Sequence, residues 1–314
     1  GGVEMGHTRA FLKIQDGCNS FCTYCAIPFA RGKSRSIAVR DLAKRVRELH
    51  EQGTGEVVLT GVHIGDYEDV RGDRTLGLAD MVTEILETTK IPRIRLSSLE
   101  PVELTPELLA LYKNDRMCPH FHMSIQSANT RVLSAMKRKY DSEAVERALL
   151  AIQSQVPGAF VGMDVIAGFP GETEDEFADT YERLARLPWT RIHVFPYSER
   201  PGTKAVALDG SVPRDVRMLR SQRLRALSSE RLAASGREQI GAVKRVLLLK
   251  SGVEGLSRDY WPVRLSTSML ASDELHRLTS RVGTEIDVRI TGFDESEKSR
   301  MDGVLLGEIA EVLT

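Results

Sequence analysis

Residues 13–36 read KIQDGCNSFCTYCAIPFARGKSRS, and this stretch decides how the rest of the chain is interpreted. Cys18, Cys22 and Cys25 stand in a C-x3-C-x2-C spacing directly after an apolar run, residues 11–15, that indicates a β-strand. Three thiolates brought together in one loop can bind a single soft metal centre, and thiolates are the usual ligands of iron–sulfur clusters. A four-iron cubane held by three cysteines keeps one iron without a protein ligand, as catalytic zinc sites keep one open position.

A structural zinc site, or three unrelated buried thiols, is the alternative interpretation of these cysteines. A closed zinc site needs a fourth ligand, and the only other cysteine in the sequence, Cys118, lies far downstream. The iron–sulfur cluster is therefore the favoured hypothesis. We expect Cys118 itself to be an ordinary buried thiol.

The composition predicts a soluble globular protein of a reducing compartment, the cytoplasm. The 314 residues are 41% hydrophobic and 28% charged, which fits one large domain or two unequal ones. Three clustered cysteines out of four do not suggest a disulfide framework, and no apolar run is long enough to span a bilayer. Because the net charge is −1, any RNA contact must come from local basic patches.

Between residues 11 and 197, short β-type runs alternate with helical patterns, which predicts a parallel sheet covered by helices. The predicted strands are 11–15, 56–60, 93–98, 120–125, 161–166 and 191–196. The predicted helices are about 37–52, 76–90, 105–114, 129–137, 142–155 and 174–187. Thr105 before Pro106, and Thr173 with Glu176, mark two of the helix starts. Six strand–helix units are fewer than the eight of a closed barrel.

The alternation within the strands predicts a polar cavity. One face of the fourth predicted strand carries only polar side chains, His120, His122, Ser124 and Gln126. The third and sixth strands alternate in the same way, and the fifth follows the pattern least. An open sheet with its polar face in solvent is the alternative, but parallel sheets are almost always covered on both faces. We therefore expect a curled sheet whose polar lumen is satisfied by a ligand or water.

Several ligand-binding segments follow the predicted strands directly. The cysteines follow the first strand, and residues 61–63, 126–127 and 168–171 follow the second, fourth and fifth. Ligands of α/β folds bind at the carboxyl ends of strands, so we expect these segments to gather at one rim. The glycine-rich segment 168–171 lacks the lysine of a P-loop and the spacing of a dinucleotide fingerprint. A tight turn into the helix capped by Thr173 is the alternative to a cofactor role.

The segments GCNSFCTYCAIPFARGKSRS, TGVHIG, RIRLSSLEP, HMSIQSAN, DVIAGFPGETEDEF and HVFPYSERPGTKA follow one another in an order that resembles the radical S-adenosylmethionine (SAM) methylthiotransferases. Among these, the chain is most similar to the enzymes that modify threonylcarbamoyladenosine in transfer RNA, and the resemblance covers nearly the whole chain. It implies an α/β fold, namely a partial (β/α)6 radical SAM barrel followed by a small all-β, OB-like TRAM barrel. It also implies one [4Fe–4S] cluster in this chain, bound by Cys18, Cys22 and Cys25, with SAM at its open iron.

The resemblance further implies which residues contact SAM. Tyr24 and residues 165–168 are expected near the adenine, residues 61–63 near the amino group, and residues 126–127 near the ribose. The complete predicted cofactor-binding set is Tyr24, Gly61, Val62, His63, Ser97, Gln126, Ser127, Asp164, Val165 and Gly168. No catalytic side chain is assigned.

The alternating pattern stops after residue 202. A predicted helix at about 214–238 leads to short β-type runs that suggest a small barrel: 243–249, 260–265, 285–291 and 303–308. With the resemblance, this predicts a leader or linker at 1–10, a radical SAM domain with its linking helix at 11–238, and a TRAM-like domain at 239–314. Residues 268–281 indicate a helical insertion in that last domain.

Basic residues cluster at 31–35, at 137–139 and along 214–237. Such runs are usually solvated faces, although the first lies close enough to the cysteines to contact a substrate phosphate. Tyr260 and Trp261 could stack on bases if they are exposed, and they fit a core position equally well.

By resemblance, the expected function is thiomethylation of threonylcarbamoyladenosine next to the tRNA anticodon, with tRNA and an electron donor as partners and no membrane contact. The reduced cluster would send an electron into SAM, and the resulting 5′-deoxyadenosyl radical would remove hydrogen from the adenine base. Isopentenyladenosine in tRNA or an aspartate of a ribosomal protein is the alternative substrate. A non-catalytic RNA-binding iron–sulfur protein is the alternative of another class.

The sequence departs from the family in one respect. Complete methylthiotransferases carry an N-terminal domain with three further cysteines that bind a second cluster, and no such cysteines precede Cys18 here. Either this chain is a fragment or the chemistry of the second cluster is absent. The hypothesis is that the chain binds one cluster and cleaves SAM but does not complete sulfur transfer.

Overall fold

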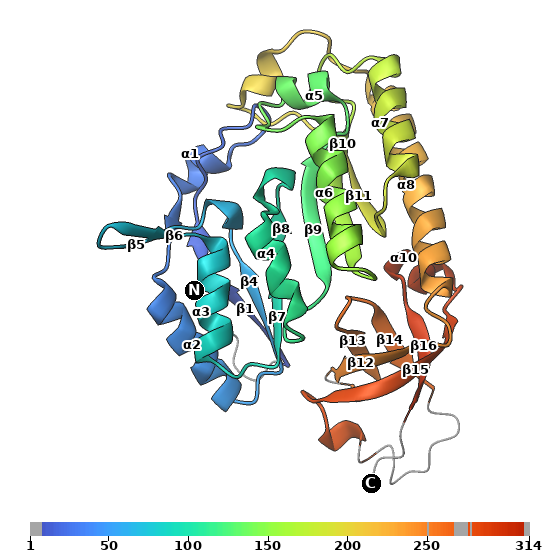
Figure 1. The fold of residues 1–314 in the computed structure, drawn as a ribbon. Helices are drawn as coiled ribbons and strands as arrows, with labels where there is room; N and C mark the ends of the chain where they lie inside the picture. The colour runs from blue at the N-terminus through green and yellow to red at the C-terminus, as the bar shows by residue number, and fades with distance from the viewer. Residues whose placement is uncertain (1–7, 250, 267–275, 277, 311–314) are drawn as a thin grey trace.

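The structure is a computed structural model that describes residues 8–249, 251–266, 276 and 278–310. Its larger part is a curved sheet of parallel strands, joined by a long helix to a small β-barrel (Figure 1). The strands of the sheet are β1 (Arg9–Lys13), β4 (Glu56–Thr60), β7 (Arg93–Leu96), β8 (Ser98–Leu99), β9 (His120–Gln126), β10 (Phe160–Ala167) and β11 (Arg191–Pro196). They form two hydrogen-bonded halves, with the orders β1-β4-β7 and β8-β9-β10-β11.

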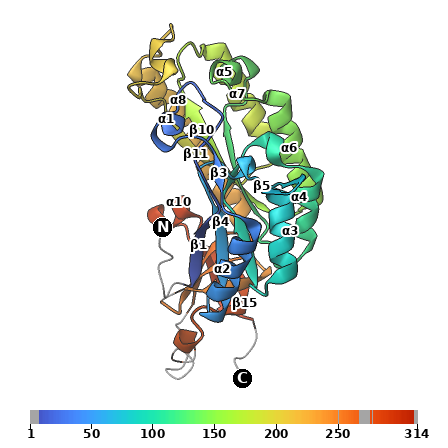
Figure 2. The same ribbon diagram turned by 90° about the vertical axis from the view of Figure 1, so that its left-hand side faces the viewer.

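The helices between these strands lie along the outer face of the sheet. They are α2 (Val39–Glu51), α3 (Leu78–Thr88), α4 (Pro106–Ala110), α5 (Thr130–Ala135), α6 (Ser142–Gln155) and α7 (Glu174–Arg186). Figure 2 shows α3, α4 and α6 stacked on one side of the strands. The predicted alternation of strands and helices is confirmed, and the sheet curls without closing because it has too few units for a complete barrel.

The boundaries differ from the predictions where the chain makes a short or divided element. The third predicted strand breaks at Ser97, so that β7 belongs to one half of the sheet and β8 to the other. Some elements are too short for hydrophobic periodicity to indicate them. These are α1 (Ile27–Arg31), β2 (Gln15–Asp16), β3 (Arg35–Ser36), β5 (Asp69–Arg71) and β6 (Arg74–Leu76).

The apolar faces of the strands pack on the apolar stripes of the helices. In α2 the stripe consists of Val39, Leu42, Val46 and Leu49, spaced three or four residues apart, and all of them are buried. Burying one such side chain stabilises the fold by roughly 1.5–3 kcal/mol. The core therefore lies between the sheet and the helices, and the concave face of the sheet is left to polar side chains.

Both predicted helix starts are confirmed. The Thr105 hydroxyl accepts a hydrogen bond from the backbone N–H of Leu108 at 3.2 Å. Thr173 and Glu176 form a reciprocal capping box, in which each side chain accepts from the backbone N–H of the other, at 3.3 and 2.8 Å.

At the amino-terminal end of the sheet, ion pairs within the protein satisfy the charged side chains of the polar concave face. The strand register places Arg9, Glu56 and Arg93 side by side on neighbouring strands. Glu56 is fully buried and accepts hydrogen bonds from Arg9 at 2.7 Å, Arg93 at 2.8 Å and Arg95 at 3.0 Å. Although burial alone would raise it, these guanidinium groups, Arg95 foremost, hold the pKa of the Glu56 carboxyl well below its usual range.

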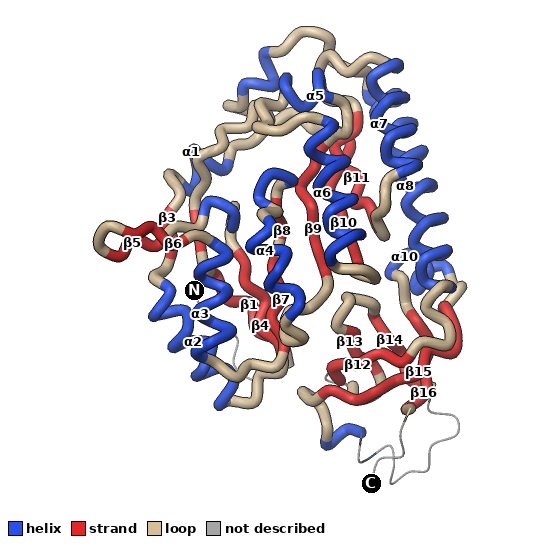
Figure 3. Tube along the Cα trace, in the orientation of Figure 1, coloured by secondary structure: helices blue, strands red, loops and turns tan. Residues whose placement is uncertain are grey.

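The C-terminal segment forms the predicted small barrel. It is closed, in the order β12-β13-β14-β16-β15. Its elements are β12 (Val243–Leu248), β13 (Glu254–Ser257), β14 (Pro262–Leu265), β15 (Glu285–Phe293), α10 (Glu297–Asp302) and β16 (Leu305–Ile309). The predictions missed β13, and the predicted insertion at 268–281 lies mostly outside the described residues. Figure 3 shows the barrel below the amino-terminal ends of the parallel strands.

The turn between β13 and β14 docks the barrel on the sheet. The Ser257 carbonyl accepts a hydrogen bond from Arg93 at 3.1 Å. The Tyr260 ring stacks on His120 with ring centroids 3.9 Å apart, and Trp261 is only 2% exposed. Of the two interpretations of Tyr260 and Trp261, packing within the protein is therefore the correct one.

The helix α8 (Arg214–Arg237) connects sheet and barrel, and its basic residues are not all on a solvated face as predicted. Arg217 and Arg220 are buried. Arg220 donates to the Glu172 carboxylate at 2.9 Å, and Arg217 donates to the Tyr197 carbonyl at 3.0 Å. The prediction fails for these two arginines because their partners come from distant segments that the local sequence does not reveal. No helix in the described ranges has both the length and the apolar character that crossing a bilayer requires.

We predict that Glu56→Gln lowers the free energy of unfolding by about 3 kcal/mol, because it leaves buried Arg95 without its counter-charge. Urea denaturation measures the change, with Glu48→Gln in the exposed Lys44–Glu48 pair as control. Since the folded-state pKa of Glu56 is depressed, its contribution is complete above about pH 4.5 and declines as the pH falls below that value. An unfolding midpoint equal to that of Glu48→Gln would contradict this role.

Candidate functional site

The three clustered cysteines lie in the loop that leaves the sheet after β1. All three are free thiols that line one pocket of about 130 Å³, with Cys22 buried and the other two half-buried. The loop is closed at its base by the pairing of β2 with β3. Gly17, in a left-handed conformation at φ 78°, lies so close to Lys33 that a Cβ would stand 2.1 Å from its carbonyl oxygen. Glycine is therefore required where the loop begins.

The pocket lies at the carboxyl ends of the strands, as expected for a ligand site of an α/β fold. Its lining residues are Cys18, Ser20, Cys22, Tyr24, Cys25, Ile27, Val62, His63, Ser98, Leu99, Glu100, Ser124, Gln126 and Arg138. The structure thus brings Tyr24, Val62, His63 and Gln126 together with the cysteines. Their roles toward SAM stay predictions.

The glycine-rich turn adjoins this pocket through aromatic rings. Phe169 contacts Tyr24 edge to face, with centroids 6.4 Å apart. Gly168, at φ 76°, faces Arg217, whose Cγ would stand 2.4 Å from an added Cβ. A glycine at position 168 therefore allows α8 to approach the turn closely, which is a structural reason for a glycine here.

Other predicted SAM contacts do not line the pocket. Ser127 is buried, and its hydroxyl lies 3.3 Å from that of Thr180 in α7. Val165 is buried in the core between sheet and helices. Asp164 lies 2.9 Å from His122 on the concave face.

Two further predicted residues, Gly61 and Ser97, also do not line the pocket. A Cβ at Gly61 would stand 2.9 Å from Gln15, so this glycine permits a close approach of two loops. The hydroxyl of Ser97 is buried without a hydrogen-bond partner among the described residues. An unpaired buried hydroxyl is costly, and a contact of Ser97 with SAM stays a prediction.

The cysteine sulfurs have hydrogen-bond donors of the kind that support thiolate ligands. The guanidinium of Arg138 donates to Cys22 Sγ at 3.3 Å, and the backbone N–H of Ser20 donates to Cys18 Sγ at 3.4 Å. Burial raises the pKa of the Cys25 thiol. Burial also acts to raise that of Cys18, but hydrogen bonds from His63 and Ser20 outweigh it and lower the pKa. Such outer contacts tune cluster potentials, so the residues fit an iron–sulfur cluster.

The zinc alternative is not supported by the position of the fourth cysteine. Cys118 is fully buried, 3.9 Å from Glu56, at the opposite end of the sheet from the cysteine pocket. Ligand atoms of Cys18, His63 and Asp66 lie within 4.8 Å of one another, but this group includes neither of the other cysteines of the motif. The three clustered cysteines therefore have no fourth cysteine with which to close a site.

His63, in the loop after β4, is held in place by carboxylates. Its Nε2 lies 2.5 Å from Glu103 and its Nδ1 lies 3.2 Å from Asp66. Burial acts against protonation, but the bonds to Asp66, Cys18 and Glu103 prevail and raise the pKa of His63 to about 12. The ring is therefore a cation at neutral pH. Through its bond to Cys18, it connects the loop after β4 to the cysteine loop.

Arg138 is a residue of the pocket that the sequence did not predict. It stands in the basic cluster 137–139, which was expected to be a solvated face, yet its side chain is only 6% exposed. Besides Cys22, it donates to Glu100 at 2.9 Å and to the Ser124 carbonyl at 2.6 Å. Lys137, at φ 60°, makes the sharp turn just before it. No local pattern separates this inward arginine from its two exposed neighbours.

Gln126 has a strained backbone at the point where β9 reaches the pocket. Its φ is 62°, in the left-handed region that side-chain-bearing residues seldom adopt. Such strain is concentrated at functional sites. The conformation ends the strand and places the amide side chain among the lining residues of the pocket.

Comparison with known proteins identifies relatives of this chain. The Radical SAM superfamily matches residues 12–184. The threonylcarbamoyladenosine tRNA methylthiotransferase MtaB of Aquifex aeolicus is 42% identical over 220 residues, which are 70% of this chain and 53% of the relative. The protein of the same name in Bacillus subtilis is 43% identical over 223 residues, 70% of this chain and 49% of the relative.

A relative with another printed substrate is less similar. The tRNA-2-methylthio-N(6)-dimethylallyladenosine synthase of Acetivibrio thermocellus is 34% identical over 251 residues, 80% of this chain and 51% of the relative. The chain spans about half the length of the curated relatives it matches. The predicted resemblance to radical SAM methylthiotransferases is confirmed.

Solved structures agree on the fold. Coproporphyrinogen III oxidase (HemN) of Escherichia coli aligns with a TM-score of 0.51 at 18% identity, over 75% of this chain and 58% of that chain. The methyltransferase TsrM of Kitasatospora setae, with cobalamin and a [4Fe–4S] cluster, aligns with a TM-score of 0.51 at 16% identity, over 62% and 38%. At these identities the likeness supports the partial radical SAM barrel and nothing finer.

We predict that replacing Cys18, Cys22 or Cys25 by serine abolishes iron binding after anaerobic reconstitution, because each change removes one thiolate of the set. Iron per chain and visible charge-transfer absorption measure the effect. Cys118→Ser is the matched control and should retain the iron of the unmodified chain. Loss of iron in Cys118→Ser equal to that in the other three variants would show that the set is assigned wrongly.

We predict that Arg138→Gln makes the reduction potential of the bound cluster more negative by about 65 mV. A hydrogen bond to a charged acceptor contributes about 1.5 kcal/mol, which is slightly more than a tenfold change in an equilibrium constant. For a one-electron reduction, a tenfold change in the equilibrium constant corresponds to about 59 mV. EPR-monitored redox titration measures this at equal iron content. Lys139→Gln, which removes an exposed charge from the same loop, should leave the potential near that of the unmodified chain; equal shifts in both variants would refute the contact.

Proposed function

This chain belongs to the radical SAM superfamily, and from that premise we propose that it binds one [4Fe–4S] cluster through Cys18, Cys22 and Cys25 and cleaves SAM beside it. The observation that carries the proposal is the convergence of three free thiols, with hydrogen-bond donors to two of them, in a pocket at the carboxyl rim of the parallel strands.

Different residues of the pocket would bind different parts of SAM. When bound, the cluster supplies the electron that reductively cleaves SAM. Tyr24, packed edge to face on Phe169, offers a flat apolar surface suited to an adenine ring. The amide of Gln126 can both donate to and accept from ribose hydroxyls. Val62 and Leu99, which also line the pocket, reduce the access of water to the site.

Charged residues of the pocket are positioned by one another. Arg138 connects Cys22 to Glu100, so that the carboxylate and the thiolate share one buried cation. Burial raises the pKa of Glu100. We assign Arg138 a positioning role, because it fixes both groups and is itself fixed by the Ser124 carbonyl.

We further propose that the substrate is threonylcarbamoyladenosine in tRNA and that the reaction as a whole is methylthiolation. The support is that relatives with that printed name include proteins 42–43% identical to this chain, whereas the dimethylallyladenosine synthases are 30–35% identical; two further relatives with the first name are 34–36% identical. The latter substrate is the second candidate. In this proposal the closed C-terminal barrel is a TRAM-like RNA-binding domain, and an electron donor reduces the cluster. Because the chain spans about half the length of these relatives, their complete reaction is a wider proposal than SAM cleavage.

We predict that the anaerobically reconstituted chain forms 5′-deoxyadenosine from SAM when dithionite is added, and that Cys22→Ser forms none. Cys118→Ser should retain the activity of the unmodified chain. Chromatography of the quenched reaction measures the product. Product absent from the unmodified chain at full iron content would favour a non-catalytic RNA-binding iron–sulfur protein.

The substrate is tested in the source organism by comparing tRNA nucleosides with and without the gene. The first candidate predicts loss of the methylthio group from threonylcarbamoyladenosine alone. Loss from the dimethylallyl nucleoside instead would select the second candidate.

A further inference from the structure

The base of the cysteine loop closes around the side chain of Gln15, the first residue of β2. Gln15 is only 1% exposed, although it carries a polar amide. Its Nε2 donates to the Gly17 carbonyl at 2.7 Å and to the Ser34 hydroxyl at 2.8 Å, and its Oε1 accepts from the backbone N–H of His63 at 2.9 Å. One buried side chain therefore connects the start of the cysteine loop, the end of that loop and the loop after β4.

The partners of Gln15 are matched to an amide. The Gly17 carbonyl can only accept a hydrogen bond and the His63 N–H can only donate one, so the donor and acceptor ends of the amide are fixed. A glutamate would keep the acceptor for His63 but would place an oxygen against the Gly17 carbonyl. A Cβ at Gly61 would stand 2.9 Å from Oε1 of Gln15, so the glycine there leaves room for the amide. Because a buried donor or acceptor without a partner is costly, a change at Gln15 should open the base of the loop.

Cys18 is the cysteine that these contacts position. It follows Gly17 directly, and its backbone N–H donates to the Gly32 carbonyl at 3.1 Å. Its Sγ lies 3.6 Å from Nδ1 of His63. Because Gln15 holds both Gly17 and His63, it fixes the backbone of Cys18 from one side and its sulfur from the other.

The part of the loop that carries Cys22 has a separate anchor. Thr23, the next residue, donates its backbone N–H to the Met136 carbonyl at 3.1 Å and its hydroxyl to the Ala135 carbonyl at 2.9 Å. Neither of these two contacts involves Gln15. Loss of the Gln15 contacts should therefore move the start of the loop and leave the anchor at Thr23 in place.

We propose that Gln15 is a positioning residue that holds Cys18 beside Cys22 and Cys25, so that the three thiols converge before any metal binds. A set of ligands that is already in place binds more tightly, because binding does not have to order the loop. That these thiols hold an iron–sulfur cluster rests on the proposed function, whereas their convergence in the metal-free chain does not.

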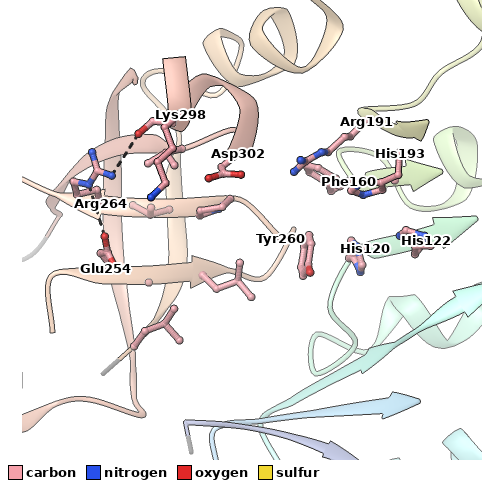
Figure 4. Close-up of a pocket in the computed structure, with 18 residues that line it drawn as sticks. His120, His122, Phe160, Arg191, His193, Glu254, Tyr260, Arg264, Lys298 and Asp302 are labelled. Carbon is pink, nitrogen blue, oxygen red and sulfur yellow. Dashed lines mark hydrogen bonds and ion pairs between the residues drawn. The ribbon is translucent and has the colours of Figure 1, made fainter. Parts of the chain in front are cut away.

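The opposite end of the sheet provides a measure of the fold that is independent of Gln15. Figure 4 shows that end, where Tyr260 of the barrel stacks on His120, the first residue of β9. The His120 N–H donates to the Cys118 carbonyl at 2.7 Å, and the Cys118 thiol is fully buried. The pocket drawn in Figure 4 shares no lining residue with the cysteine pocket. Alkylation of Cys118 therefore reports whether the fold opens away from the cysteine loop.

Calorimetric titration of the whole, metal-free chain with arsenite tests the proposal, because arsenite forms one complex with three thiols without any redox change. Gln15→Glu should bind arsenite about tenfold more weakly than the unmodified chain, since both hydrogen bonds that the amide donates are lost. Ser34→Ala removes one of the acceptors and should weaken binding several-fold. Gln222→Glu makes the same chemical change at an exposed position of α8 and should bind as the unmodified chain does.

The rate at which iodoacetamide alkylates Cys118, measured by mass spectrometry on the same samples, separates positioning from a general role in the fold. Weaker arsenite binding with Cys118 still protected supports the proposal. Faster alkylation of Cys118 in both Gln15→Glu and Ser34→Ala would overturn it, as would arsenite binding by both variants equal to that of Gln222→Glu. An unmodified chain that does not bind arsenite would overturn it too. An unmodified chain that binds arsenite but takes up no iron would refute the cluster and leave the role of Gln15 intact.

Discussion

The structure depends on how an incomplete barrel satisfies a concave face lined with polar side chains. At the amino-terminal end, the carboxylate of Glu56 pairs with three arginines, and Arg93 reaches on to Glu285 and to the Ser257 carbonyl of the small barrel. Buried charges are tolerated only when they are paired and hydrogen-bonded. The contacts that pair these buried charges therefore also hold the C-terminal barrel against the sheet.

The carboxyl-terminal end of the face is arranged for a different purpose. There the polar groups converge on three thiols, and buried Arg138 connects the cysteine loop to Glu100 and to the end of β9. Strain at Gln126 and an unpaired hydroxyl at Ser97 are left in place. The charged side chains at one end of the sheet are thus paired within the protein, whereas the other end carries the pocket for the proposed cofactors.

Sequence periodicity predicted the fold well because strand and helix patterns are local. The bounds of β4, β11 and α6 agree with the predictions to the residue. The cysteine spacing likewise predicted which thiols share a pocket. Burial of Arg138 and Arg220 was not predictable, because Cys22 and Glu172, their partners, lie 116 and 48 residues away. Such pairs arise from the tertiary fold, and no local pattern distinguishes them from solvated basic runs.

We propose that three thiolates hold a cubane whose fourth iron is open to SAM. EPR spectroscopy of the anaerobically reconstituted, reduced chain before and after addition of SAM tests this arrangement. We expect the signal of a reduced [4Fe–4S] cluster whose g values change when SAM is added. A signal that does not respond to SAM, or a chain that holds zinc in place of iron, would contradict it.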